Sequence, residues 1–316
     1  MVLPEHADVV VVGGGHAGLC TAISAAERGR QVYLLERAPK VMRGGNTRHT
    51  RNLRAMHEMP VAGLTGRYSG DEYWQDLMRV TQGHTDPELA KIMIHKSESL
   101  LQWLQDHGVH FQPSLSGTLS LGRTNAFFLG GGCALSNALY LAAERAGVQV
   151  AYDSHVTDVE IDGNTCKTVT VEINGVQHKL GAAVFIMTCG GFQANDEWMR
   201  QVWGPAADNF LIRGTPYNEG HVLQALMKHG VATTGDPTQC HAVAIDARAP
   251  KYDGGIVSRL DCVPFSIVVN QDGKRFYDEG EDFWPKRYAI WGRLIAAQPN
   301  QIAYAIIDSK VTHRFM

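Results

Sequence analysis

The first hydrophobic runs of the chain are short and uninterrupted. Residues 9–12 are all valine, and residues 32–35 read Val-Tyr-Leu-Leu. Such runs are typical of strands that are buried on both faces of a parallel sheet. Between them, residues 19–28 are rich in alanine and Gly29 follows as a helix stop. The apolar positions of this helix form one stripe, namely Leu19, Ala22, Ile23 and Ala26. The pattern predicts a strand–helix–strand unit whose two strands are parallel.

Helical periodicity returns further along the chain. Asp86-Pro87 is a helix start with proline in the first turn, and Gly108 marks the end of that helix. We expect one face of it to carry Leu89, Ile92, Met93, Leu100 and Leu104. A second helix is predicted at about residues 135–146, ending at Gly147.

Alternating patterns then replace the helical ones. Residues 156–161 and 169–173 alternate apolar and polar side chains, and the turns Asp162-Gly163 and Asn174-Gly175 follow them. This arrangement predicts a small antiparallel meander. Residues 182–187 form a further apolar run, which predicts another buried strand.

Composition and charge narrow the class of protein. The chain has 316 residues, of which 44% are hydrophobic and 19% charged, so it is an ordered globular protein of about two domains. Its net charge of −3 excludes a strongly basic nucleic-acid binder, and no nucleic-acid partner is expected. No two of the six cysteines lie within four residues of each other, so neither a metal site nor a redox dithiol is predicted. Scattered thiols and the lack of a secretion-signal pattern lead us to expect a cytoplasmic protein.

The turn after the first strand carries the most informative motif. Gly13, Gly15 and Gly18 form a G-x-G-x-x-G pattern that opens a helix, and Glu36 follows the second strand. In such units the first glycine permits the tight turn, the second lets the backbone approach a pyrophosphate, and the third lets helix and strand pack closely. The acidic residue accepts hydrogen bonds from a ribose hydroxyl and disfavours a 2′-phosphate. The unit predicts a dinucleotide site, and NAD and FAD both remain open at this point.

Two further segments combine glycine pairs with small polar residues. Residues 43–47 read Arg-Gly-Gly-Asn-Thr, and the strand at 182–187 runs into Thr188-Cys189-Gly190-Gly191-Phe192. Taken alone each is a turn, although each could also lie against a flat ring.

With these motifs the chain resembles the FAD-dependent oxidoreductases typified by the fumarate reductase and succinate dehydrogenase flavoproteins. Asn218-Glu219-Gly220-His221 and the segment 270–276, Asn-Gln-Asp-Gly-Lys-Arg-Phe, also carry the resemblance, which spans essentially the whole chain. Within the family, residues 43–49 and 275–287 are most similar to tricarballylate dehydrogenases.

The resemblance implies an α/β fold: a Rossmann-like FAD-binding domain with a β-meander, and an α+β domain that caps the substrate. We expect the first over residues 1–236 and the second over 237–316, with a boundary near Pro237. The cofactor-binding residues expected from the fingerprint and the resemblance are Gly13, Gly14, Gly15, Ala17, Gly18, Glu36, Arg37, Gly44, Gly45, Asn46, Thr47, Val156, Thr188, Gly190 and Gly191.

The same resemblance implies hydride transfer between FAD and a carbon of a small carboxylate. It places His241 on a substrate carboxylate and Arg287 as the proton donor or acceptor. Without the resemblance, each of these two residues is more often structural or solvated. Arg275 and Glu279 are expected to stabilise the capping region rather than contact the substrate.

The expected reaction is the oxidation of tricarballylate to cis-aconitate, with an electron-acceptor protein or a quinone-linked partner. The alternatives are a fumarate-reductase-like or 3-ketosteroid-dehydrogenase-like flavoenzyme, or a non-catalytic dinucleotide-binding protein.

Two departures from the family pattern carry expectations of their own. Asn46 stands where covalent members have a flavin-linked histidine, and His49 lies three residues later, so we expect non-covalent FAD. Nothing after Asp308-Ser309-Lys310 resembles the glycine-rich segment that usually completes the flavin domain. From this we expect an incomplete domain with weak FAD retention.

Overall fold

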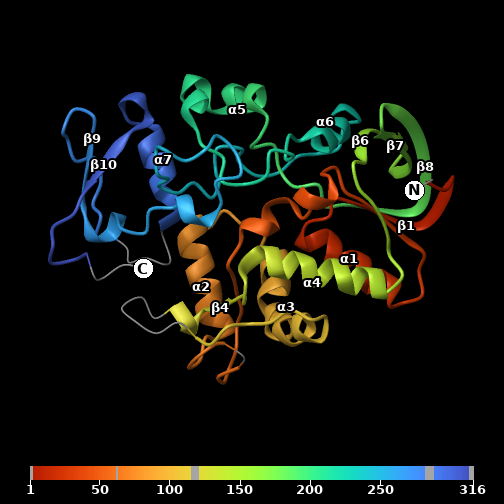
Figure 1. The fold of residues 1–316 in the computed structure, drawn as a ribbon, viewed down its shortest axis with the longest axis horizontal. Coiled ribbons are helices and arrows are strands. Elements are labelled where there is room, and N and C mark those ends of the chain that lie inside the picture. The colour runs from red at the N-terminus through yellow and green to blue at the C-terminus, as the bar shows by residue number, and fades with distance from the viewer. Residues whose placement is uncertain (1–2, 62, 115–120, 282–287, 313–316) are drawn as a thin grey trace.

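The computed structural model describes residues 3–61, 63–114, 121–281 and 288–312. Its main unit is a six-stranded sheet in the order β5-β2-β1-β8-β7-β6. Neighbours among β5, β2, β1 and β8 are parallel, whereas β8, β7 and β6 pair antiparallel. The strands are β1 (His6–Val12), β2 (Val32–Leu35), β5 (Gln149–Ala151), β6 (His155–Asp162), β7 (Thr165–Ile173) and β8 (Val176–Met187). The predicted mixed α/β fold with a Rossmann-like unit is confirmed (Figure 1).

Helix α1 (His16–Ala26) crosses over between β1 and β2, which pair in parallel with Val9 opposite Val32. The four valines of β1 point alternately to the two faces of the sheet. Val9 and Val11 pack with α1 and α4 (Gly131–Arg145), whereas Val10 and Val12 pack with the meander and α6 (His221–Lys228). Both faces of the central strand are therefore buried, as the uninterrupted valine run predicts.

The meander grows out of the parallel sheet because β8 belongs to both. Residues 181–187 of β8 pair with β1, and residues 176–181 pair with β7. The turn before β8 places Asn174 and Gly175 at φ values of 51° and 75°, the left-handed geometry that this dipeptide favours in hairpins. The run 182–187 is a strand, as predicted, but the expectation that it is buried is only partly correct, because Ala182 is buried whereas Val184 keeps 49% of its surface exposed.

Two helices form a lobe below the sheet in Figure 1: α2 (Gly70–Thr81) and α3 (Pro87–Asp106). Asp86 caps α3 by accepting hydrogen bonds from the backbone N–H groups of Glu88 and Leu89. The predicted apolar face of this helix is wrong in its first half, because Leu89, Ile92 and Met93 are exposed. The buried positions follow an equally regular helical spacing, namely Ala90, Ile94, Ser97, Leu101 and Leu104.

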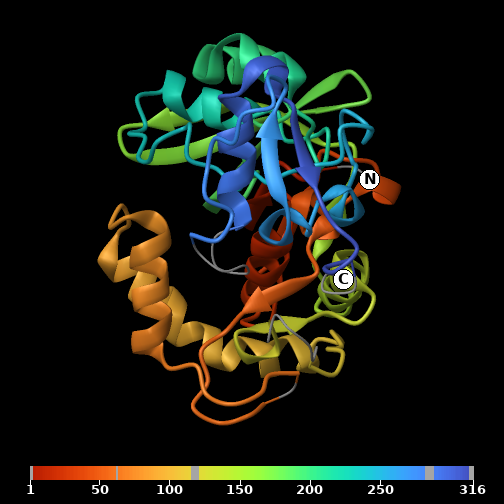
Figure 2. The same cartoon turned by 90° about the vertical axis from the view of Figure 1, so that its left-hand side faces the viewer.

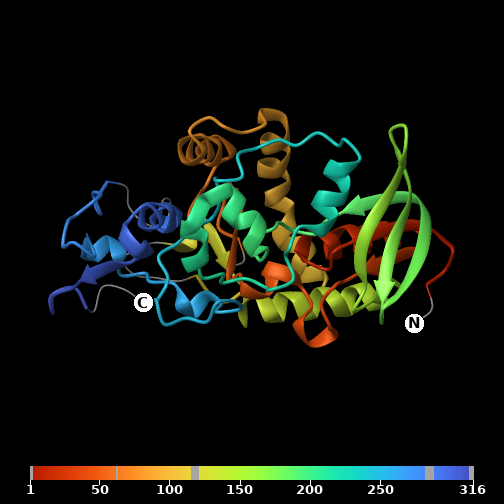
Figure 3. The same cartoon turned by 90° about the horizontal axis from the view of Figure 1, so that it is seen from above.

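The C-terminal elements have a small core of their own. The ribbon of β9 (Ile267–Asn270) and β10 (Ala303–Ile306) packs with α7 (Trp291–Ala296) around Ala244, Val263, Val268 and Trp291. This region lies at the opposite end of the long axis from the meander (Figures 1 and 3) and faces the viewer in Figure 2. The remaining elements are β3 (Asn52–Arg54), β4 (Asn125–Phe127) and α5 (Asp196–Trp203), which lie between the two ends.

Candidate functional site

The glycines after β1 have distinct steric roles. Gly13 has a φ of +107°, and a Cβ atom there would lie 2.5 Å from the backbone oxygen of Thr188. A Cβ atom on Gly18 would lie 1.9 Å from the backbone oxygen of Gly13, so only glycine allows α1 to approach the turn. A Cβ atom on Gly15 would meet its nearest neighbour, the hydroxyl of Thr47, at 3.6 Å, which is an ordinary contact. The turn thus leaves a cradle at the N-terminal end of α1, where anionic groups are stabilised.

Glu36 anchors the wall of the cradle at the end of β2. Its carboxylate is 5% exposed and accepts a hydrogen bond from the backbone N–H of Ala38 at 2.8 Å and from that of Gly44 at 3.3 Å. The hydroxyl of Tyr140, from α4, lies 3.2 Å from this carboxylate and 2.9 Å from the backbone oxygen of Gly14. Burial raises the pKa of Glu36, although these donors oppose the shift. Glu36 therefore points toward the glycine turn, as the strand–helix–strand unit predicts.

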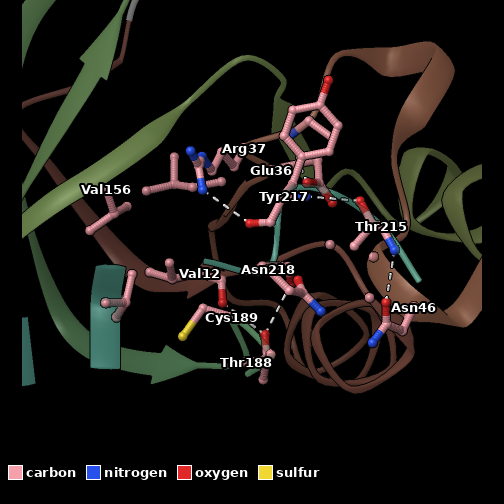
Figure 4. A pocket seen from close by; sticks show the side chains of 18 of the residues that line it. Val12, Glu36, Arg37, Asn46, Val156, Thr188, Cys189, Thr215, Tyr217 and Asn218 are labelled. Carbon is pink, nitrogen blue, oxygen red and sulfur yellow. Dashed lines mark hydrogen bonds between the residues drawn. The ribbon is translucent and has the colours of Figure 1, made fainter. Parts of the chain in front are cut away.

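Two loops close the opposite wall. The hydroxyl of Thr47 accepts a hydrogen bond from the backbone N–H of His16 at 2.9 Å, and the side-chain oxygen of Asn46 accepts one from Thr215 at 3.0 Å. The hydroxyl of Thr188 lies 3.0 Å from the backbone oxygens of both Val12 and Gly13. Both glycine-pair segments are thereby tied to the turn after β1, although they are distant from it in sequence (Figure 4).

These walls enclose one pocket, which Figure 4 shows from close by. Most of the residues expected to bind the cofactor line it: Gly13, Gly14, Gly15, Ala17, Glu36, Arg37, Gly45, Asn46, Thr47, Val156, Thr188, Gly190 and Gly191. Gly18 and Gly44 are not among the lining residues. Gly18 packs against Gly13, and the N–H of Gly44 is directed to Glu36.

Part of the pocket comes from a segment for which the sequence predicts no cofactor contact. Tyr217, Asn218, Gly220 and His221 line it beside Gly190. Arg37 holds this segment by donating a hydrogen bond to the backbone oxygen of Tyr217 at 3.0 Å and by pairing with Glu219. The motif at residues 218–221 is the sequence signal that could have predicted this part of the pocket, because a glycine followed by an Ala/Leu-rich helix often marks a helix that begins at a ligand.

Several further lining residues outside the expected set come from the start of β6 and from single positions in loops. Ser154, His155, Cys189 and Thr215 line the pocket. The His155 and His221 rings lie 4.7 Å apart, and burial followed by the charge of Arg37 lowers the pKa of His155. No spacing in the sequence connects these positions, since they meet only through the fold.

A second group of ionisable residues lies next to the pocket, and we call it the basic cluster: Arg51, Arg213, His241, Arg259 and Asp261. The guanidinium of Arg259 pairs with Asp261 at 2.6 Å and lies over the Tyr288 ring, 4.6 Å from its centroid. The His241 ring meets the same Tyr288 ring edge-on at 5.3 Å. The predicted substrate histidine is thus brought together with arginines that the sequence did not single out.

The electrostatics of the cluster follow from burial and like charge. Burial, together with the charge of Arg259, lowers the pKa of both Arg51 and Arg213. The pKa of His241 falls to about 4, mainly because the surrounding protein desolvates the ring and then because Arg213 and Arg259 repel its proton. Part of the His241 surface is nevertheless exposed, so a ligand can reach the ring. At neutral pH His241 is uncharged, and the positive charge of the cluster resides on its arginines.

The 3₁₀ helix η2 (Gly45–His49) connects the pocket with the basic cluster. Its residues Gly45, Asn46 and Thr47 line the pocket. At its other end, His49 pairs with Asp253 at 2.6 Å, and the charge of Arg213 contributes to lowering the pKa of His49. One end of η2 therefore lines the pocket, and the other end lies within the electrostatic influence of the basic cluster.

The remaining predictions concern the C-terminal region. Arg287, the expected proton donor or acceptor, lies outside the described residues. Arg275 pairs with Glu279, whose carboxylate accepts a hydrogen bond from the backbone N–H of Val268 at 2.7 Å, and these contacts agree with the stabilising role that we expect for both. Over the ranges that the structure covers, no helix has the length and apolar character needed to cross a membrane.

The chain is similar to flavoproteins over nearly its whole length. It is 26% identical to the NADH:fumarate oxidoreductase of Klebsiella pneumoniae, covering 98% of this chain and 32% of that protein. It is also 26% identical to the fumarate reductase (cytochrome) of Shewanella frigidimarina, covering 97% of this chain and 53% of that protein. The chain thus spans about half or less of the length of these relatives.

The fold is shared with solved flavoenzyme structures. The 3-ketosteroid-Δ4-(5α)-dehydrogenase from Rhodococcus jostii RHA1 superimposes with a TM-score of 0.74 at 20% identity, covering 98% of this chain and 68% of that one. The model of the family described as FAD binding domain matches residues 8–312. FAD is accordingly the cofactor of this chain, and the glycine cradle, Glu36 and the small polar loops suit it. The chain belongs to the FAD binding domain family.

Proposed function

We propose that this chain holds the flavin and part of the substrate site of an oxidoreductase that acts on the CH–CH bond of a small polycarboxylate. The observation that carries the proposal is the basic cluster, which η2 connects to the FAD pocket. Buried guanidinium groups bind carboxylates well because they donate two parallel hydrogen bonds. The names of two relatives, a fumarate oxidoreductase and a fumarate reductase, agree with a carboxylate substrate.

The most specific form of the proposal is the oxidation of tricarballylate to cis-aconitate. The glycine turn and Glu36 would hold FAD, which would supply the hydride acceptor for one carbon of the substrate. The neutral His241 donates a hydrogen bond to a substrate carboxylate, and the arginines of the cluster provide the opposite charge. Arg287 takes up the proton from the adjacent carbon, as the resemblance implies. The electrons then pass to an acceptor protein or a quinone-linked partner in the cytoplasm.

A fumarate-reductase-like direction is the second candidate, and the names of the two relatives favour it. A neutral steroid is disfavoured, because it would leave the positive charge of the cluster without a counter-charge. The similarity to the ketosteroid dehydrogenase therefore supports the fold only.

Anaerobic spectroscopy of the purified full-length protein separates these candidates. The expected result is bleaching of the oxidised flavin band by tricarballylate, but not by succinate or a 3-ketosteroid. Reoxidation of the reduced flavin by fumarate, without any bleaching by tricarballylate, would favour the reductase. A protein that carries flavin but responds to none of these compounds would contradict both.

The same sample tests how the flavin is attached. Because Asn46 uses its side-chain oxygen to bind the Thr215 backbone and His49 pairs with Asp253, we expect no covalent bond between flavin and chain. Acid precipitation should leave all of the yellow colour in the supernatant. Flavin that remains on the precipitated chain, seen as an added mass on the intact protein, would contradict this expectation.

A further inference from the structure

The basic cluster holds more positive than negative charge. Among the residues that the structure describes, Arg259 pairs with the carboxylate of Asp261, and the charges of Arg259 and Asp261 act on the pKa values of both Arg51 and Arg213. Arg259 forms the ion pair with this carboxylate, and the Arg259 side chain is only 4% exposed. Buried cations are stable when a counter-charge and hydrogen-bond acceptors complete their shell. The cluster therefore has the composition of an anion site.

The backbone at Arg213 and Gly214 is held next to the FAD pocket by hydrogen bonds and a close contact. Its backbone oxygen accepts a hydrogen bond from Gly255 at 3.0 Å, and that of Gly214 accepts one from Asp253 at 2.9 Å. A Cβ atom on Gly214 would lie 2.0 Å from the side-chain oxygen of Asn46, so this stretch of chain presses directly against a pocket residue. The position of Arg213 relative to the pocket is set by backbone contacts on both sides.

Among the residues that the structure describes, the side chain of Arg213 does not find an acceptor for each of its hydrogen-bond donors. Its Nε atom is buried and has no hydrogen-bond partner among those residues. A buried donor without an acceptor costs free energy, and a carboxylate oxygen is the acceptor that removes this cost most effectively. The charge of Arg213 also contributes to lowering the pKa of His241, so a carboxylate bound at Arg213 would lie within electrostatic range of the predicted substrate histidine.

We propose that Arg213, with Arg259 beside it, forms a second carboxylate subsite next to His241 and thereby selects tricarboxylates over dicarboxylates. This inference rests on the proposed function. A dicarboxylate with one carboxylate at His241 either leaves the Arg213 subsite empty or places its second carboxylate there. A tricarboxylate has a further carboxylate that Arg213 can bind with paired hydrogen bonds.

The test is a binding measurement on the oxidised, flavin-loaded protein by isothermal titration calorimetry, with tricarballylate and succinate as probes. Arg213→Gln should weaken tricarballylate binding by about 10- to 100-fold, because a charged hydrogen-bond pair is lost. Succinate binding should change by less than about 3-fold, since this ligand does not depend on a second subsite. Arg248→Gln is the matched control, because the Arg248 side chain is 89% exposed and pairs with Asp246 at the surface.

Arg213→Lys addresses the possibility that the glutamine variant loses its fold or its flavin. Lysine keeps the charge but not the planar fork, so tricarballylate binding should weaken by about 3- to 10-fold while the flavin absorbance and the melting temperature are retained. Unchanged tricarballylate affinity in Arg213→Lys or Arg213→Gln would overturn the proposal. So would equal losses for tricarballylate and succinate in a folded Arg213→Gln variant.

The binding experiment and the bleaching experiment fail independently. If tricarballylate binds through Arg213 but never bleaches the flavin, the subsite stands and the proposed reaction falls. If tricarballylate bleaches the flavin of Arg213→Gln at the same half-saturating concentration as in the unchanged protein, the reaction stands and the subsite falls.

Discussion

The FAD pocket and the basic cluster lie side by side, but they are built from different parts of the polypeptide. The pocket is shaped by the backbone. Gly13 adopts a positive φ at which other residues are strained, and Gly18 lets helix α1 approach the Gly13 backbone more closely than any side chain would allow. The cluster is made of side chains from four separate loops, and its arginines repel one another. A pocket formed by the backbone suits a cofactor, whose structure does not vary. A cluster of side chains can be altered by substitution, so it suits a substrate that differs between proteins.

We expect the largest effect on stability from a substitution that adds a side chain between the Gly18 and Gly13 backbones. Gly18→Ala places a carbon against the Gly13 backbone oxygen, which no side-chain movement can relieve. We expect a loss of about 3 kcal/mol in the free energy of unfolding, measured with urea, together with loss of FAD.

Gly15→Ala is the control for this change. Its added carbon meets only ordinary contacts, so the apoprotein should keep its stability to within about 1 kcal/mol while its FAD affinity falls. Equal stability losses in the two variants would show that the pocket is not governed by backbone approach in the way that we describe.

A second prediction concerns the buried charge in the pocket. Because the pKa of Glu36 is raised above its usual 4.5, the folded apoprotein binds this proton more tightly than the unfolded chain does. The contribution of Glu36 to stability is therefore lost as the pH rises from about 4.5. Glu36→Gln removes this dependence, so between pH 5 and pH 8 the variant apoprotein should lose less stability than the unchanged one.

The same variant should bind FAD about 10-fold more weakly, since a charged acceptor for the ribose is lost. Fluorescence titration of the apoprotein with FAD measures this affinity. Unchanged affinity would contradict the role of Glu36 at the ribose, whatever the pH dependence of unfolding shows.

The smallest effect is expected in the basic cluster. His241 has a pKa of about 4 in the free protein and is neutral at pH 5.5, but a bound polycarboxylate beside it would raise that pKa. Tricarballylate binding should therefore take up a fraction of a proton at pH 5.5 and none from His241 at pH 8. Calorimetry in buffers with different ionisation enthalpies measures the uptake, and His241→Gln should abolish it. Uptake that persists in this variant would assign the proton to another group.

The contrast between the two regions also explains what could be predicted from the sequence. The glycine pattern, the valine run and the Asn174-Gly175 turn each specify local backbone geometry, so the crossover unit and the meander could be predicted. Arg213 and His241 meet only through the packing of distant loops, and no local pattern encodes that meeting.

Helix α3 shows the same limit within one element. Its sequence offers two apolar faces with helical spacing, and the choice between them depends on which neighbour covers the helix. Pattern alone favoured the face with Leu89 and Ile92, but tertiary packing buries the face with Ile94 and Leu101.

Helix η2 lies between the FAD pocket and the basic cluster. It has only five residues, with Asn46 bonded to Thr215 on one side and His49 paired with Asp253 on the other. A molecule that displaced this segment from one side would also disturb its contacts on the other side. By thermodynamic reciprocity, two molecules coupled in this way would change each other's affinity by the same factor. If the proposed substrate binds at the basic cluster, we therefore expect a variant that weakens FAD retention at η2 to weaken substrate binding as well.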